Sequence, residues 1–288
     1  MGLLKAAVSR RPVRSGGQSF DRQQSPSMAD DGPPATSVSV VRITAGMGVI
    51  PGFARAVADV CRYVGCDAEV SLWPDVAGFA DAVERGVEVV LSADDHRFVA
   101  LHLPSGSCFD NSVATGTAYA VALECAAGGV GGRRVLVFGL GPVGLAAAAR
   151  LASAGAEVLA VEPDWARADE AMSSFPWLRV IDAEKGLVSC RLVLDASPAS
   201  DLIDAEWVTS GCVVAGPGVP SGLTAAAARA LGPRSIHEPL ALGVATMATS
   251  ASIAAREYDP AAARPRRGGR RGVAAGDAGG PYTREEVM

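Results

Sequence analysis

The chain has 288 residues, with 26 Lys and Arg against 31 Asp and Glu, and a formal net charge of −5. This length predicts two domains, since a domain has roughly 100–200 residues. The charge excludes the strongly basic surfaces that bind nucleic acid or anionic membranes, so small molecules are the expected partners. Only 5% of the residues are aromatic, and the abundant Ala, Val, Leu and Gly favour helices and buried parallel strands over a disulfide scaffold.

The cysteines and histidines show no metal-binding pattern. Six cysteines, at positions 61, 66, 108, 125, 190 and 212, form no C-x-x-C pair, and we interpret them as reduced thiols. His96, His102 and His237 share no ligand spacing, so no metal is predicted. The sequence has no signal-peptide core and no uncharged apolar run of about 18 residues. These features predict a cytoplasmic protein.

Both ends of the chain lack hydrophobic periodicity. Residues 1–37 mix Arg, Ser, Gln, Gly and Pro, and residues 256–288 carry Arg among Gly and Pro. Such segments bury too little surface to offset the entropy of ordering. The sequence therefore predicts a disordered leader and a disordered basic tail, and organelle targeting by the Arg-rich leader is the alternative.

Residues 38–128 predict a small N-terminal α/β domain. Residues 38–43, 68–72 and 87–91 have the composition of strands. Apolar residues between them recur at helical spacing, which predicts two helices and a small parallel sheet. An Ala-rich helix over 115–127 is predicted to bridge to the next domain.

Residues 129–255 predict a Rossmann domain. The predicted strands span 133–138, 156–161, 178–181, 192–195 and 212–215, and the predicted helices span 142–153 and 165–173. This alternation is typical of a doubly wound α/β fold. The fold class is therefore α/β, a C-terminal Rossmann domain with a smaller N-terminal α/β domain.

A glycine motif follows the first strand of the predicted Rossmann domain and opens its helix. It consists of Gly139, Leu140, Gly141, Pro142, Val143 and Gly144. In G-x-G-x-x-G the first glycine permits a tight turn, the second lets a pyrophosphate approach the backbone, and the third lets helix and strand pack closely. The motif predicts a dinucleotide site, with a purely structural turn as the alternative.

Glu162 ends the next predicted strand, 18 residues after Gly144. An acid at about this separation accepts hydrogen bonds from the adenosine ribose and disfavours the extra phosphate of NADP. NAD is therefore the predicted cofactor. Arg167, five residues further on, leaves NADP open.

Two later strand ends carry loops rich in Pro and Gly. Ligands bind at the carboxyl ends of parallel strands, so these loops are predicted to flank the nicotinamide. Simple termination of the strands is the alternative. The cofactor-binding residues predicted here are Ala196, Ser197, Pro198, Gly216, Pro217 and Gly218.

Candidate substrate residues lie in the N-terminal domain. Asp94 and Asp95 follow a predicted buried strand, where a carboxylate can bind an ammonium group or accept a proton from an amine. Two solvated loop acids are the alternative. Asn111 lies just before the bridging helix and is a candidate for a substrate carboxylate or amide, or for a helix cap. Gly46, Met47 and Gly48 form a turn at which backbone can approach a ligand.

Several segments together resemble the PylD family of pyrrolysine synthases. They are TAGMGVI at 44–50, WPDV at 73–76, ADD at 93–95, VFGLG at 137–141, GPGVP at 216–220 and EPL at 238–240. The resemblance runs from about residue 38 to residue 252. The family's N-terminal helices have no recognisable counterpart in residues 1–37.

The resemblance implies NAD-dependent oxidation of L-lysine-Nε-(3R)-methyl-D-ornithine at the terminal ornithyl amine, followed by ring closure to L-pyrrolysine. By similarity Asp94 lies nearest the reacting amine, Asn111 contacts the substrate, and the turn that continues through Val49 and Ile50 lines the cavity. Whether Asp94 is a base or an electrostatic anchor stays open.

Two other functions fit the same residues. One is a dehydrogenase of another amino acid or imine, since a fold does not fix its substrate. The other is a non-catalytic regulatory protein that binds NAD, in which Asp94 and Asn111 have no role. A homodimer is compatible with the sequence, although no motif specifies one.

Overall fold

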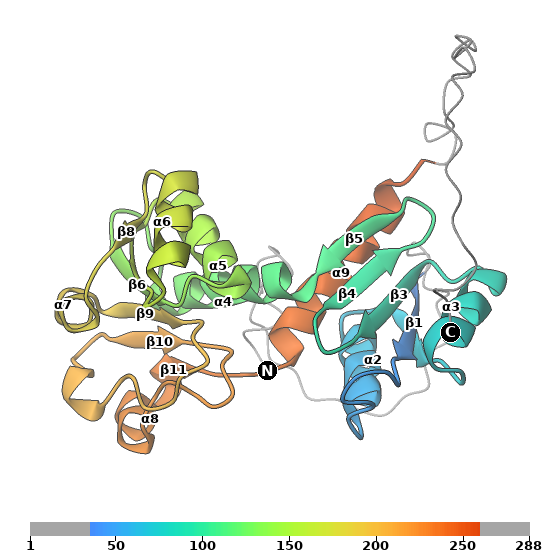
Figure 1. The fold of residues 1–288 in the computed structure, drawn as a ribbon, viewed down its shortest axis with the longest axis horizontal. Helices are drawn as coiled ribbons and strands as arrows, with labels where there is room; N and C mark the ends of the chain where they lie inside the picture. The colour runs from blue at the N-terminus through green and yellow to red at the C-terminus, as the bar shows by residue number, and fades with distance from the viewer. Residues whose placement is uncertain (1–34, 260–288) are drawn as a thin grey trace, which may run out of the picture. The chain divides into compact units, whose positions relative to one another are not determined.

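The computed structural model describes residues 35–259, which form two β-sheets covered by helices (Figure 1). The first sheet and its helices comprise β1 (Ser37–Arg42), α2 (Phe53–Tyr63), β2 (Asp67–Val70), α3 (Asp75–Glu84), β3 (Val89–Ala93), β4 (Phe98–His102) and β5 (Ser107–Asp110). Helix α4 (Asn111–Ala127) follows. The leader was predicted to be disordered to residue 37, but Ser37 already belongs to β1 and Thr36 is buried. The predicted disorder of residues 1–34 and 260–288 lies outside the described residues.

The second sheet confirms the predicted doubly wound fold. Its elements are β6 (Arg134–Phe138), α5 (Pro142–Ser153), β7 (Glu157–Val161), α6 (Trp165–Ser174), β8 (Arg179–Val180), α7 (Ala183–Ser189), β9 (Leu192–Asp195), η1 (Ala205–Trp207), β10 (Val213–Ala215), α8 (Ala225–Leu231), η2 (Gly232–Arg234) and β11 (Ser235–Ile236). The strand order is β11-β10-β9-β6-β7-β8, and all neighbouring pairs are parallel. This is the order of a Rossmann sheet.

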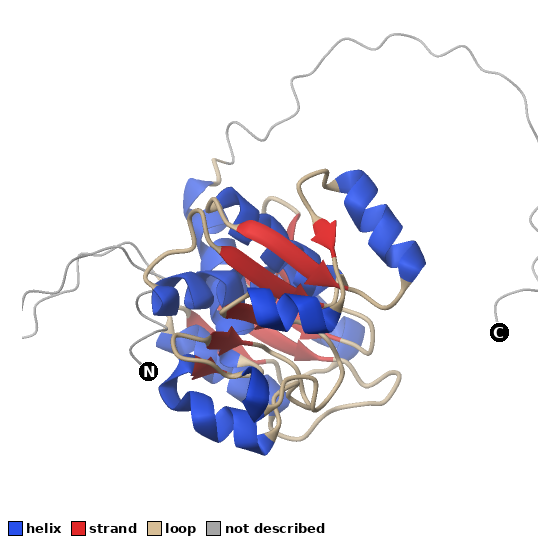
Figure 2. Cartoon of the chain, turned by 90° about the vertical axis from the view of Figure 1, so that its left-hand side faces the viewer, coloured by secondary structure: helices blue, strands red, loops and turns tan. Residues whose placement is uncertain are grey.

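Side chains of β6 alternate between the two faces of this sheet, as period-2 strands require. Val135 and Val137 pack with α4 and α5, whereas Leu136 and Phe138 pack with residues of α7 and α8. Figure 2 shows helices on both faces of the strands. The sheet is therefore buried on both faces, which explains its almost continuous apolar strands.

The first sheet is mixed, so the prediction of a small parallel sheet was wrong in part. Its order is β2-β1-β3-β4-β5. The β1–β2 and β1–β3 pairs are parallel, as predicted, but β3–β4 and β4–β5 are antiparallel. Strands β4 and β5 were not predicted, because short half-buried strands are recognisable mainly by the partners with which they pair.

The last helix, α9 (Ala241–Glu257), belongs by packing to the first sheet. Its buried residues Val244, Met247, Ala248 and Ala251 lie in the same core as Val38 and Leu91. The sequence analysis predicts that this segment belongs to the Rossmann domain, whereas it packs on the first sheet. The predicted disordered tail begins at residue 256, but the helix continues to Glu257. The other predicted domain boundaries stay predictions.

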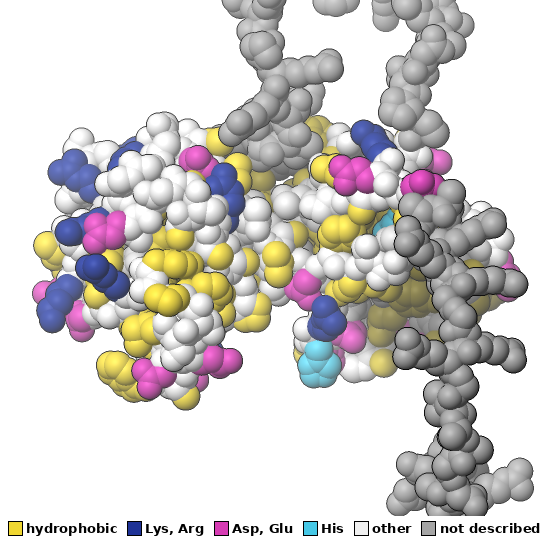
Figure 3. All heavy atoms as spheres, turned by 90° about the horizontal axis from the view of Figure 1, so that it is seen from above, with side chains coloured by type: hydrophobic (Ala, Val, Ile, Leu, Met, Phe, Trp, Pro, Cys, Tyr) yellow, Lys and Arg dark blue, Asp and Glu magenta, His cyan; other side chains and the backbone are white. Residues whose placement is uncertain are grey.

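The described surface carries mixed charges. On the face drawn in Figure 3, basic and acidic side chains are interspersed among apolar ones, without a large patch of one sign. None of the helices within residues 35–259 is long and apolar enough to cross a membrane.

The packing of α9 predicts the effect of shortening Met247, whose side chain is fully buried. Met247→Ala is expected to lower the free energy of unfolding by about 2–4 kcal/mol, because it leaves a cavity in the first core. Ile253→Ala is the matched control, since Ile253 lies on the same helix and is 50% exposed. Urea unfolding measures both variants, and equal losses would contradict this placement of α9.

Candidate functional site

The glycine motif forms a tight loop between β6 and α5. Gly139 has a φ of +82°, which favours glycine. A Cβ atom on Gly144 would lie 1.9 Å from the carbonyl oxygen of Gly139, so the backbones at these two positions leave no room for a side chain. A Cβ atom on Gly141 would meet nothing within 4 Å. Gly141 thus faces open space where a ligand can approach, which fits the predicted pyrophosphate site.

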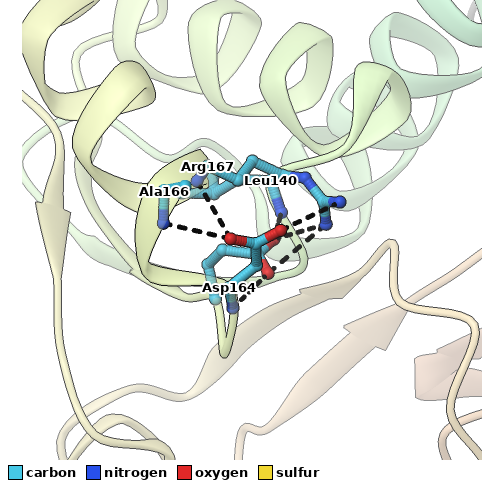
Figure 4. Close-up of polar contacts among 5 residues, drawn as sticks. Leu140, Asp164, Ala166 and Arg167 are labelled. Carbon is cyan, nitrogen blue, oxygen red and sulfur yellow. Dashed lines mark hydrogen bonds and ion pairs between the residues drawn. The ribbon is translucent and has the colours of Figure 1, made fainter.

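Glu162 supports this loop from the end of β7. Its Oε2 accepts a hydrogen bond from the Leu140 N–H at 2.8 Å, and its Oε1 accepts one from the Asp164 N–H at 3.0 Å. The Arg167 guanidinium lies 3.4 Å from both oxygens, and Figure 4 shows these polar contacts. Although burial opposes ionisation, the N–H groups of Leu140 and Asp164 hold the pKa of Glu162 below its ordinary value.

The carboxylate of Glu162 is therefore engaged within the chain, and its side chain is only 2% exposed. The ribose contact inferred from the sequence stays a prediction, whereas support of the glycine loop is what the geometry shows. Arg167 is 50% exposed and borders a cavity of about 250 Å³ together with Gly141, Pro142 and Glu170.

Asp195, at the end of β9, holds two strand-end loops together. Its Oδ1 accepts hydrogen bonds from the N–H and the hydroxyl of Ser197, at 3.1 and 2.7 Å, and its Oδ2 accepts one from the Gly222 N–H at 3.1 Å. Burial raises the pKa of Asp195 above its ordinary value, against the effect of these hydrogen bonds. Sequence reasoning placed the two loops at the cofactor but missed the carboxylate that joins them.

The loop after β9 lies beside the glycine motif, and the loop after β10 lies beside the loop after β9. A Cβ atom on Gly139 would be 3.0 Å from the Ala196 carbonyl oxygen, and one on Gly218 would be 3.0 Å from the Ser197 carbonyl oxygen. One on Gly216 would be 2.8 Å from the Asp195 carbonyl oxygen. The structure therefore brings all three predicted cofactor segments together at the carboxyl ends of β6, β9 and β10.

A second region of the site is a cavity of about 310 Å³ at the carboxyl ends of β1 and β3. Met47, Gly48, Val49, Ile50 and Asp94 all line it, as the sequence predicted. Asp95, which the sequence placed beside Asp94 at this strand end, also lines the cavity, as do Arg42, Phe53 and Phe98, which the sequence did not single out for the site. Apolar side chains, two acids and Arg42 thus surround one space, and the acids suit a ligand with a cationic end.

Asp95 fixes the turn that lines this cavity. Its carboxylate accepts hydrogen bonds from the Met47 N–H at 3.2 and 3.0 Å. Gly46 has a φ of +68°, and a Cβ atom there would lie 2.0 Å from Asp95 Oδ2. Gly46 itself is not among the residues that line the cavity, so its role is to let the turn approach Asp95.

Asp94 has one oxygen committed to the β3–β4 turn. Its Oδ1 accepts hydrogen bonds from the His96 N–H at 2.8 Å and the Arg97 N–H at 2.7 Å. The N–H groups of Arg97 and His96 hold the pKa of Asp94 below its ordinary value. A carboxylate with a lowered pKa is a weak base, so this geometry favours an electrostatic anchor over a proton acceptor.

Asn111 is the first residue of α4, so the prediction that it lies before the helix was wrong. The helix starts four residues earlier than predicted because Asp110 caps it, accepting a hydrogen bond from the Ser112 N–H at 2.8 Å. Asn111 is not among the residues that line the 310 Å³ cavity. A Cβ atom on Gly243 of α9 would lie 2.8 Å from Asn111 Oδ1, which places Asn111 against that helix.

Comparisons with known proteins give one family. Residues 14–109 match the family model described as "Pyrrolysine biosynthesis protein PylD, N-terminal domain". The chain is 30% identical over 217 residues to "Pyrrolysine synthase" of Methanosarcina acetivorans, covering 75% of this chain and 82% of that protein. It is 31% identical over 212 residues to "Pyrrolysine synthase" of Methanosarcina barkeri, covering 73% and 79%. Because the family model starts at residue 14, part of the leader does have a counterpart in the family, contrary to the sequence analysis.

Solved structures share the fold. Shikimate dehydrogenase from Aquifex aeolicus superimposes with a TM-score of 0.52 at 14% identity, covering 78% of this chain and 98% of that one. Shikimate 5-dehydrogenase from Thermus thermophilus, in complex with shikimate, gives 0.52 at 20% identity, covering 78% and 94%. At these identities the likeness concerns the fold alone.

The two glycines of the loop predict opposite consequences of substitution. Gly141→Val is expected to keep the free energy of unfolding within about 1 kcal/mol and to abolish dinucleotide binding, because its side chain enters open space at the loop. Gly144→Val is expected to lower stability by about 2 kcal/mol or more, because it meets the Gly139 carbonyl. Urea unfolding and calorimetric titration separate the two effects. Normal cofactor affinity in Gly141→Val would contradict the assignment of this loop.

The lowered pKa of Glu162 predicts a pH-dependent effect of Glu162→Gln. The ionised carboxylate stabilises the fold above its ordinary pKa of 4.5, and this stabilisation is lost as the pH falls through the lower folded pKa. At pH 7 the variant is expected to lose about 2 kcal/mol of unfolding free energy, and the loss should shrink towards pH 3. Glu157→Gln is the control, because Glu157 is exposed and pairs only with exposed Arg134. A loss that is the same at pH 7 and pH 3 would show that ionisation of Glu162 is unimportant.

Proposed function

This chain belongs to the pyrrolysine synthase (PylD) family, and from that premise we propose that it catalyses the NAD-dependent oxidation of L-lysine-Nε-(3R)-methyl-D-ornithine to L-pyrrolysine. The observation that carries the proposal is the match to two proteins named pyrrolysine synthase over 79–82% of their length. The glycine loop and the acid-lined cavity support it independently, since an amine oxidation by NAD needs a dinucleotide site and an amine site.

The proposed reaction removes a hydride and a proton from the substrate and then closes a ring. The terminal ornithyl CH₂–NH₃⁺ loses both to give a protonated imine. The ornithyl α-amine attacks the imine carbon, ammonia leaves, and the five-membered pyrroline ring forms. When bound, NAD supplies the hydride acceptor. The protein's task is to hold the substrate so that the amine and the imine carbon of one molecule meet.

The residues of the second sheet suit the cofactor. Gly141 leaves room for the pyrophosphate at the N-terminus of α5, where free N–H groups favour phosphate. Glu162, Asp164 and Glu170 lie beside Arg167, where the sequence predicts the adenosine ribose. This excess of negative charge favours NAD over the additional phosphate of NADP.

In the first sheet, we assign Asp94 the role of holding the substrate ammonium in the 310 Å³ cavity. Its Oδ1 is fixed by the turn, and its lowered pKa keeps it charged. Asp94 is exposed on the β3–β4 turn, and Phe53, Phe98 and Ile50 line the same cavity, so a bound substrate that displaces water from this space would strengthen the ion pair. Asn111 is assigned to the substrate by similarity to the family.

The direct test is to measure nicotinamide reduction by the purified protein with L-lysine-Nε-(3R)-methyl-D-ornithine, comparing NAD with NADP and analysing the product by mass. We expect reduction of NAD and a product lighter than the substrate by one ammonia and two hydrogens. Binding of NAD without oxidation of this substrate would leave the Rossmann site intact and reject the proposed reaction.

The anchoring role predicts the effect of Asp94→Asn. The asparagine oxygen can still accept the hydrogen bonds from His96 and Arg97, so the turn is retained while the negative charge is lost. Turnover is expected to fall about 100-fold, because the amine is no longer held in position for hydride transfer. The Kd for NAD should change less than about twofold, because Asp94 lies outside the predicted cofactor loops. Glu84→Gln, an exposed acid at the end of α3, controls for the change of charge. If Asp94→Asn weakens NAD binding as much as turnover, its assigned role is wrong.

A further inference from the structure

A larger cavity adjoins the one that contains Asp94. Its volume is about 690 Å³, and it lies against the start of α2 and the ends of β1 and β2. The two cavities share four lining residues, which are Arg42, Val49, Ile50 and Ala54. One elongated ligand can therefore occupy both.

The charges of this larger cavity are mainly positive. Three arginines and one glutamate line it, namely Arg42, Arg55, Arg62 and Glu69. Arg62 pairs with Asp59 at 2.7 Å, and Glu69 pairs with Arg85. Arg55 is exposed, and its side chain has no hydrogen bond or ion pair with any residue of the described part of the chain. Two guanidinium groups, those of Arg42 and Arg55, are thus left without an acidic partner within residues 35–259.

Arg42 is held at the boundary between the two cavities. Its Nη2 donates hydrogen bonds to the carbonyl oxygens of Ser71 and Leu72, at 3.3 and 2.9 Å. Its Nε is buried and has no acceptor among the residues described. A buried, unpaired N–H of a charged group is unfavourable unless a ligand supplies the acceptor. Arg42 also pairs with Ala93 in the parallel β1–β3 register. Since Ala93 directly precedes Asp94 in the sequence, Arg42 lies near that acid.

We infer that the larger cavity binds the carboxylate end of an elongated amino-acid substrate, with Arg42 and Arg55 as its carboxylate-binding residues. This inference rests on the proposed function, because the lysyl half of that substrate ends in a carboxylate and the ornithyl half ends in an amine. Guanidinium groups match carboxylates in geometry and charge. The amine end then lies at Asp94 and the carboxylate end at Arg55.

This arrangement selects for length as well as for charge. Free lysine or ornithine carries its amine and carboxylate closer together than the amide-linked substrate does. A short amino acid therefore satisfies one end of the joined cavities but not both. A short amino acid therefore forms one ion pair fewer than the elongated amide, so the joined cavities favour binding of the elongated amide over lysine or ornithine.

The test compares the natural lysyl carboxylate with a substrate in which it is replaced by a carboxamide. For the wild type, the KM of the carboxamide is expected to be about tenfold higher, with kcat within twofold. Arg55→Gln should raise the KM of the carboxylate substrate about tenfold and leave that of the carboxamide within twofold. Arg55 is exposed, so this substitution spares folding. Arg42→Gln should act in the same direction.

Arg229→Gln is the control for the loss of a positive charge, since Arg229 is exposed on α8 and lines neither cavity. It should leave the preference for the carboxylate unchanged. If Arg55→Gln affects both substrates equally, or affects neither, the inference is overturned.

Calorimetric titration in the presence of NAD separates failure of the inference from failure of the proposed function. A wild type that binds the carboxylate substrate about tenfold more tightly than the carboxamide but oxidises neither would keep the carboxylate site and reject the reaction. A wild type that oxidises both with equal KM would keep the reaction and reject the carboxylate site.

Discussion

The close approach of Gly144 to the carbonyl group of Gly139 is the constraint on which the loop between β6 and α5 depends. A Cβ atom at position 144 would lie 1.9 Å from that carbonyl oxygen, so only hydrogen fits there. This contact sets the angle at which α5 leaves β6, and it leaves Gly141 beside open space. The Glu162 carboxylate then fixes Leu140 by its N–H. The loop is therefore organised by the chain itself, so a ligand does not bear the cost of ordering it.

Acidic side chains also accept hydrogen bonds from loop N–H groups near the ends of other strands. Asp195 joins Ser197 and Gly222, Asp95 holds Met47, and Asp75 accepts a hydrogen bond from the Thr44 N–H at 2.7 Å. In each case a short acid accepts a backbone N–H that the sheet leaves unpaired. These bonds stabilise loops at the two places where the cofactor and the substrate are proposed to bind. Asp94 differs, because only one of its oxygens is used in this way.

Local signals predicted the elements around the glycine loop well. Helix α5 and strand β9 lie at the predicted bounds, because the glycine motif, Pro142 and the apolar runs act over a few neighbouring residues. The predicted loop at 196–198 does meet the glycine loop, and the predicted loop at 216–218 meets residues 195–197. The buried state of Glu162 was not predicted, because spacing places an acid at a strand end without saying which way its carboxylate faces.

Contacts between distant segments account for the rest. Strands β4 and β5 form by antiparallel pairing with β3, and α9 packs on a core whose first residue lies about 200 positions earlier. Asn111 belongs to α4 because Asp110 caps the N-terminus of that helix. Arg42 is not part of any recognisable sequence motif. Its proposed role depends on its buried Nε and on its position between two cavities, and both exist only in the folded chain.

The most direct measurement of the central claim is isotope transfer from the substrate carbon. L-lysine-Nε-(3R)-methyl-D-ornithine with two deuterium atoms on the terminal ornithyl carbon would be incubated with the protein and NAD. The account predicts one deuterium in the reduced nicotinamide and one on the ring carbon of the pyrroline product. Reduced nicotinamide without deuterium, or a product that keeps both atoms, would contradict oxidation at that carbon.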